Sequence, residues 1–275
     1  MTIIHYYNYI IILIMNDTNL KLAIGGSMGV VESMIGGNLL ENLKFMKQNG
    51  TKYNNAVKIL YQRNGLYGLM YSGYFPAGLV QSLCKGMPFF YTSFTVKEYM
   101  IKKKYDSNTI ALASGAAGGL SQGLFMGPTQ RVRVLLVMTK DMTLSGILKQ
   151  EKLNIFKGTP LLSVRRALDW SLRSFIMNKL NIDNSNSNIL LSSFAGGLMA
   201  VFTLPLDVLI TRIQTSNTNI SLVTLVKTMI KNEGIKSLAN GLVMRSLYSG
   251  WHTMWVAGIG TIVYNKFKNN DLQKL

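Results

Sequence analysis

The sequence contains few acidic residues, only two histidines and a single cysteine. Its 275 residues include 29 Lys and Arg but only 12 Asp and Glu, for a formal net charge of +17. The lone cysteine, Cys84, excludes a disulfide within the chain. His5 and His252 lack the spacing of metal ligands, and no nucleophile is paired with a base. We therefore predict no metal site, no catalytic residue and no enzymatic activity.

Long uninterrupted apolar runs are also missing, although the chain as a whole is apolar. Hydrophobic residues make up 48% of it and charged residues 15%. That balance is too apolar for an ordinary soluble domain of this size and indicates a membrane protein. Yet no stretch reaches about eighteen apolar residues without interruption. Helices that line a polar cavity have this pattern, because one face is wet while the other meets lipid.

Proline is scarce as well, with five residues, and two of them mark a bend that recurs along the chain. Pro205 opens the motif P-L-D-x-x-x-T-R-x-Q, and Pro128 opens a looser copy of it. The first copy, L-L-E-N-L-K at residues 39–44, has no proline. Proline removes a backbone donor and clashes with the preceding turn, so both prolines are predicted to kink their helices.

A regular period extends over the whole chain. The turn residues Gly73 and Gly158 are 85 residues apart, and Gly158 and Gly241 are 83 apart. Each third has a helix rich in small residues, a bend, a short amphipathic segment, a glycine turn and a second long helix, which indicates a repeat architecture. The predicted divisions are an N-terminal extension (1–19), three repeats (20–105, 106–182 and 183–268) and a C-terminal tail (269–275). The extension has neither a basic segment nor a cleavage site typical of a secretory signal, and Met15 is an alternative start.

Three cations lie in the middle of apolar segments, one in the second long helix of each third: Lys85, Arg165 and Arg245. A cation at such depth is costly unless it faces water or a partner, so they are predicted to line a central cavity. Arginine's planar fork suits carboxylates. Arg166 adds a fourth cation, which Asp169, three residues further on, could neutralise along the helix. The alternative is that these cations hold helix ends or lipid headgroups.

With these motifs, residues 20–268 resemble the mitochondrial carrier family. The P-L-D-x-x-x-T-R-x-Q motif after a glycine-rich helix carries the resemblance. It implies an all-α membrane protein with three tandem repeats of two transmembrane helices plus a short matrix helix, forming a six-helix bundle around a central cavity. It also implies multi-pass insertion in the mitochondrial inner membrane, no cofactor, and cardiolipin as a bound lipid.

Within that family the chain is most similar to the branch of the yeast citrate–oxoglutarate carrier. The residues that carry this likeness are C-K-G at 84–86, V-R-R at 164–166 with D-W at 169–170, and Arg245 with G-W-H-T at 250–253. This resemblance implies a substrate site formed by Gln81, Lys85, Arg165, Arg166 and Arg245. Gln81 departs from the branch, which has an acid there, and Arg166 replaces a glutamine. The added positive charge favours a more highly charged anion, or one that brings no compensating proton.

The resemblance also implies a gate of ion pairs at each end of the cavity. The matrix gate would pair Glu41 with Arg133 and Lys44 with Asp207. The third pair would need Gln130 and Ile210, which cannot form a salt bridge. Because an orphaned buried charge is costly, the loss of both members together indicates a working two-bridge gate, with neutral drift as the alternative.

The cytoplasmic gate is predicted to be weaker. Glu98 is the one acid at that end, with Lys268 as its partner, because Asn178 and Asn265 stand where the family has acids. The terminal lysines could equally extend to the lipid headgroups.

The predicted function is antiport of di- or tricarboxylates of the citrate/2-oxoglutarate type by alternating access. The partners are an anionic carboxylate and membrane lipid, but not nucleic acid, because the basic residues are spread over helix ends. The alternative is a carrier-fold structural subunit of a larger mitochondrial membrane complex, favoured by the lost bridge and the weak gate. Both a monomer and a subunit of an assembly are compatible with the sequence.

Overall fold

The computed structural model describes residues 17–139, 143–180, 189–216 and 221–272. Within these ranges all regular secondary structure is helical and no strand occurs, which agrees with the predicted all-α class. The predictions for residues 1–16 and for residues 273–275 lie outside the described residues, as does the junction of the second and third predicted repeats at 181–188.

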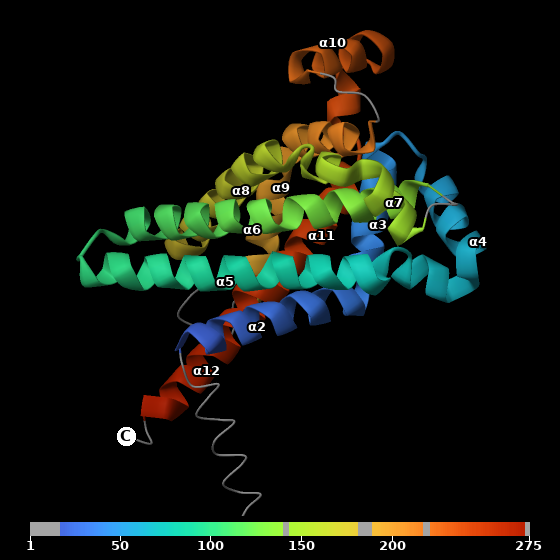
Figure 1. Ribbon diagram of the computed structural model, residues 1–275. Coiled ribbons are helices and arrows are strands. Elements are labelled where there is room, and N and C mark those ends of the chain that lie inside the picture. Colours follow the sequence, from blue (N-terminus) through green and yellow to red (C-terminus); the bar gives the residue numbers. More distant parts are fainter. Residues whose placement is uncertain (1–16, 140–142, 181–188, 217–220, 273–275) are drawn as a thin grey trace, which may run out of the picture.

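Long helices alternate with short helical segments along the chain (Figure 1). In chain order the elements are α2 (Asp17–Glu32), η1 (Ser33–Gly37), α3 (Asn38–Gln48), α4 (Tyr53–Tyr71), η2 (Tyr74–Gly78), α5 (Leu79–Lys102), α6 (Ser107–Met138), α7 (Leu144–Glu151), η3 (Lys152–Phe156), α8 (Thr159–Lys179), α9 (Ile189–Thr215), α10 (Leu222–Glu233), η6 (Ile235–Ala239), α11 (Leu242–Thr253), η7 (Met254–Ile259) and α12 (Gly260–Leu272).

The bend in the first third is formed by glycine rather than proline. The helix is interrupted at Ile35 and Gly36, and Gly36 has φ of +119°. Glycine adopts a positive φ without the steric cost of a side chain, so it can turn the chain here. Pro128 and Pro205 lie inside α6 and α9, which continue as α-helices on both sides of them.

The three turn glycines share one conformation and one kind of neighbour. Gly73, Gly158 and Gly241 have φ of +67°, +80° and +84°, and each directly precedes a helical segment. Gly73 lies against the end of α6, Gly158 against the end of α9, and Gly241 against the end of α3. Each turn is therefore packed on the helix that opens another third of the chain, in cyclic order.

The long helices pack in a closed sequence of neighbours. The packed pairs are α2–α5, α5–α6, α6–α8, α8–α9, α9–α11, α11–α3 and α12–α2, so the last helices return to the first. Figure 1 shows α2, α5 and α6 side by side along their length.

Glycines bring the paired helices into backbone contact. Gly115, Gly119 and Gly123 of α6 lie on the backbone of α8 at Trp170, Arg166 and Ser163. Gly25 of α2 and Gly86 of α5 face each other in the same way, and neither site has room for a Cβ atom. These contacts fix how far each helix is rotated and how it slides against its neighbour.

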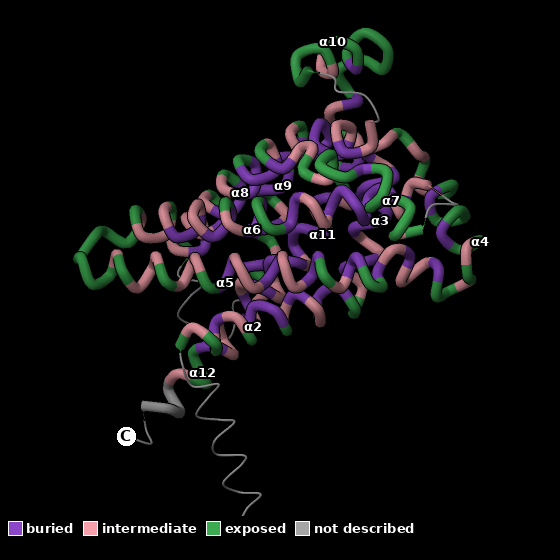
Figure 2. Tube along the Cα trace, in the orientation of Figure 1, coloured by how far each residue is buried: buried purple, intermediate pink, exposed green. Residues whose placement is uncertain are grey.

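Many polar and charged side chains are buried beside an apolar core, while other large apolar side chains are exposed. Figure 2 shows which residues are buried. Phe125, Phe194 and Phe202 are each more than 60% exposed, whereas four carboxylates and several arginines are almost fully buried. Among the described helices, α9 alone is long and apolar enough by itself to cross a membrane. The inverted distribution suits a chain whose outer surface meets lipid and whose interior is polar.

Candidate functional site

The interior of the bundle holds a large group of buried charges, here called the interior charge cluster. Its members are at most 1% exposed, and cations exceed carboxylates by seven to four, a net charge of +3. The cations are Lys44, Lys85, Arg133, Arg165, Arg166, Arg173 and Arg245, and the carboxylates are Glu32, Glu41, Asp169 and Asp207.

At one end of the cluster, two ion pairs join the three bends, and these we call the bend network. Arg133 Nη1 is 2.5 Å from Glu41 Oε2, and Lys44 Nζ is 3.4 Å from Asp207 Oδ2. Gln48 supports the second pair by donating from Nε2 to Asp207 Oδ2 at 2.9 Å. Both pairings expected from the sequence are therefore present, and their role as a gate remains a prediction.

The third position of the bend network is neutral. Gln130 donates from Nε2 to Gln214 Oε1 at 2.9 Å, and Ile210 is fully buried. An amide pair thus replaces an ion pair at this position. Because both side chains are uncharged, the replacement leaves no orphaned charge.

Gln81 was predicted to contact substrate, but the structure places it in the bend network. Its Nε2 donates to Glu41 Oε1 at 3.1 Å, and its Oε1 accepts from Arg133 Nη1 at 3.2 Å. The side chain is fully buried between the two charged groups. Its amide offers both a donor and an acceptor, which suits a position between a carboxylate and a guanidinium.

Asp169 binds three arginines from two helices. Its carboxylate lies 2.6 Å from Arg173, 3.3 Å from Arg245 and 3.5 Å from Arg165. The expected pairing of Asp169 with Arg166 is wrong. Arg165 and Arg173, each four positions away on α8, and Arg245 of α11 contact the carboxylate instead.

Asp207 serves both the bend network and the arginines. Besides Lys44, it contacts Arg245 Nε at 3.2 Å and Arg165 Nε at 3.4 Å. The acidic residue of the third bend therefore ties the proposed substrate residues directly to the proposed gate.

Arg166 is the cation of the cluster without an ion-pair partner among the described residues. Its Nη2 is 3.5 Å from the Met126 sulfur, and its Nε and Nη1 have no hydrogen-bond partner there. An unpaired guanidinium that is 1% exposed is costly to bury. Binding of an anion to Arg166 would break no existing ion pair.

Lys85 is paired with Glu32, a residue that the sequence reasoning missed. Lys85 Nζ lies 2.5 Å from Glu32 Oε2 and also donates to Tyr248 Oη at 3.1 Å. His252 lies beside them, with Nδ1 at 3.7 Å from the same carboxylate oxygen. The available signal was a single acid in an otherwise uncharged, glycine-rich stretch of α2 after Lys21.

The sequence predicted that the proposed substrate cations line an open cavity, and the structure does not show this. A cavity of about 430 Å³ lies between the ends of α5, α6, α8 and α12, and none of those cations lines it. Lys85, Arg165, Arg166 and Arg245 are instead each 1% exposed and lie in the protein interior.

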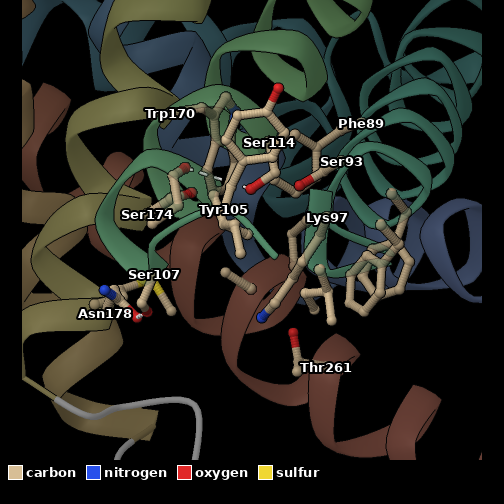
Figure 3. A pocket seen from close by; sticks show the side chains of 18 residues that line it. Phe89, Ser93, Lys97, Tyr105, Ser107, Ser114, Trp170, Ser174, Asn178 and Thr261 are labelled. Carbon is tan, nitrogen blue, oxygen red and sulfur yellow. Dashed lines mark hydrogen bonds between the residues drawn. The ribbon is translucent and has the colours of Figure 1, made fainter. Parts of the chain in front are cut away.

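An aromatic pair lies in the wall of this cavity (Figure 3). Phe89 and Trp170 both line the cavity, and their rings are stacked with centroids 3.9 Å apart. Trp170 Nε1 donates to Gln122, whose Nε2 in turn donates to the Lys85 carbonyl. Trp170 also packs edge-on against His252, which lies beside the cluster. Trp170 therefore contacts both the cavity and residues beside the charge cluster.

A second set of ion pairs, the terminal network, lies at the ends of α2, α5 and α12. Glu98 accepts from both Lys21 and Lys268 at 2.7 Å, and Tyr264 donates to Asp17 at 2.7 Å. The pairing of Glu98 with Lys268 is present as expected. Sequence reasoning missed Asp17, Lys21 and Tyr264, so this end has more contacts than the single predicted pair.

Two comparisons with known proteins each cover part of the chain. Residues 183–270 match the family model of mitochondrial carrier proteins. A 70-residue segment is 40% identical to an uncharacterized mitochondrial carrier of Schizosaccharomyces pombe. That segment is 26% of this chain and spans 18% of the relative's length.

Both matches support the mitochondrial carrier family, whose members transport solutes rather than catalyse reactions. The model match corresponds to the third predicted repeat, where the P-L-D motif is complete. Neither match supports the closer resemblance to the citrate–oxoglutarate branch.

Proposed function

We propose that this chain is a multi-pass solute carrier of the mitochondrial inner membrane that exchanges di- or tricarboxylates, of the citrate/2-oxoglutarate type, by alternating access. The observation that carries the proposal is the interior charge cluster, which has a net charge of +3 and includes an arginine without an ion-pair partner among the described residues. Guanidinium groups bind carboxylates through paired hydrogen bonds, so such a cluster favours an anion with several carboxylates.

The two ion-pair networks would be the two gates. In this assignment the bend network faces the matrix and the terminal network faces the cytosol. Both networks are formed at the same time, which corresponds to an occluded state between the two open ones. The closed sequence of helix neighbours and the three equivalent turn glycines support three repeats around a central pathway.

Substrate carboxylates would compete with the carboxylates of the protein. Asp169 and Asp207 together neutralise Arg165 and Arg245, and both are shared between several cations. An entering anion can take Arg166 first and then replace Asp207 on Arg245. Since Asp207 also holds Lys44, this replacement would weaken the bend network and link binding to gate opening.

The outer surface supports membrane lipid as a partner of this chain. Exposed apolar side chains cover the outer face, and lysines lie near helix ends, where they suit anionic headgroups such as those of cardiolipin. We propose no nucleic-acid partner and no cofactor. The Glu98–Lys268 pair, with Lys21, would close the cytosolic side.

Uptake into liposomes across a panel of carboxylates, nucleotides and phosphate tests the function. We expect citrate or oxoglutarate exchange, and we expect Lys85→Ala or Arg245→Ala to reduce it at least about tenfold, because each removes a charge that faces the substrate. Lys227→Ala, at an exposed position on α10, is the matched control. Full-rate citrate exchange by both cluster variants would refute the proposal.

A structural subunit of a larger membrane complex is the second candidate. It is favoured by the near-complete burial of the cations and by their pairing with the protein's own carboxylates. Purification in a mild detergent separates the two. A stoichiometric partner complex with no uptake of any panel substrate would favour the subunit.

A further inference from the structure

We propose that Glu32 and His252 form a proton-binding site that takes up one proton when an anion binds Lys85. The inference rests on the proposed function, in which Lys85 contacts the anionic substrate. It adds a second ligand, the proton, and assigns it to residues outside the predicted substrate site.

The geometry shows two buried polar groups that lie side by side and each have unpaired atoms. Glu32 is fully buried, and its Oε1 has no hydrogen-bond partner among the described residues. His252 is 1% exposed, and neither of its ring nitrogens has a partner there. Its Nδ1 is 3.7 Å from Glu32 Oε2. Buried polar groups are normally paired, and one proton shared between these two groups would satisfy both.

The groups that face this pair come from four helical elements. Lys85 of α5 and Ser33 of η1 both donate to Glu32 Oε2, and Tyr248 of α11 accepts from Lys85. Arg166 of α8 acts on His252 as a further positive charge. While Lys85 is bound to Glu32, its charge already neutralises the carboxylate, so the pair needs no second positive charge. The substrate-free site therefore holds no added proton.

Anion binding reverses this balance. A substrate carboxylate that binds the Lys85 ammonium draws it away from Glu32, which leaves a buried carboxylate without a cation. A proton that enters from bulk solvent with the anion then binds His252 Nδ1 or Glu32, and it returns to solvent when Lys85 pairs with Glu32 again. Each bound anion therefore carries one proton with it, and its effective charge falls by one.

Citrate binding to the full chain in detergent, measured by calorimetry in buffers of different ionisation enthalpy, tests the linkage. At a pH where citrate is fully ionised, we expect wild-type protein to take up about one proton per citrate bound. Glu32→Gln and His252→Asn should bind citrate with almost no proton uptake. Glu233→Gln, the same change at a carboxylate that is 38% exposed, is the control. If Glu32→Gln and His252→Asn both took up as much proton as wild type, the inference would be overturned.

Tryptophan fluorescence tests the site without relying on transport or citrate. The Trp170 and His252 rings are 5.7 Å apart, so a protonated imidazole should quench Trp170. Acidification of wild-type protein should give a quenching step that is absent in His252→Asn, and identical curves would refute protonation of His252. If wild-type protein binds no citrate, the proposed function falls and the linkage falls with it. The fluorescence result still decides whether His252 takes up a proton.

Discussion

At the residue scale, the buried carboxylates decide the charge state of the interior. Asp169 and Asp207 each contact three cations, and the four carboxylates together pair with six of the seven positive groups. Sharing makes each acid more important than a simple ion pair suggests. Its removal would leave several buried charges short of a partner at once.

Asp169→Asn should therefore destabilise the protein strongly. Asparagine keeps the shape of the side chain but removes the charge that holds Arg165, Arg173 and Arg245. Loss of one partner of a buried ion pair costs about 3–5 kcal/mol. Thermal unfolding in detergent should show a clearly lower midpoint than wild type. Glu233→Gln, which affects an exposed pair with Arg212, should leave the midpoint almost unchanged. Equal midpoints for both variants would contradict the assigned importance of Asp169.

At the element scale, glycines determine how closely the helices approach. Gly25 of α2 and Gly86 of α5 meet backbone to backbone, and three successive glycines of α6 meet α8 in the same way. The sequence shows this spacing directly, since the small residues of α6 recur every four positions on one helix face. The identity of the partner helix could not be predicted, because the spacing along one helix does not determine which neighbour packs against it.

Gly86→Ala should disrupt the packing of α2 on α5. A Cβ atom there would overlap the carbonyl of Gly25, and backbone can move only with its whole helix. Overpacking of this kind costs about 1–3 kcal/mol. Gly197→Ala on α9 is the matched control, because the nearest atom to its new Cβ lies at 3.6 Å, an ordinary contact. The measurement is the unfolding midpoint in detergent, and a Gly86 variant as stable as the Gly197 variant would refute the close contact.

At the scale of the whole molecule, the interior is closed at both ends. The bend network seals one side, and the terminal network and the Phe89–Trp170 pair lie toward the other. Figure 3 shows Phe89, Trp170 and Ser93 among the residues that line the cavity.

Thiol accessibility checks this closure. In a Cys84→Ser background, Ser93→Cys lies in the cavity and should react readily with a water-soluble thiol reagent. Ser33 is 1% exposed, and its hydroxyl donates to Glu32 of the charge cluster. Ser33→Cys should therefore react at least about tenfold more slowly without substrate, because the reagent does not reach a closed interior. Mass spectrometry of the labelled protein measures both rates. Equal rates would show that the interior is open.

The sequence by itself was sufficient to predict the helices, the turn glycines and the depth of the cations. Composition and short-range pattern determine these features, since a cation in an apolar helix has to lie inside. It also predicted the pairing of Glu41 with Arg133 and of Lys44 with Asp207, through family resemblance.

Only the tertiary structure decided how the remaining charges are shared. Asp169 was expected beside Arg166 but holds three other arginines, and Glu32 was not expected to pair with Lys85. The physical reason is that partners such as Glu32 and His252 lie on helices far apart in the chain. Their distance depends on the rotation and depth of each helix, which the glycine contacts set when the bundle closes.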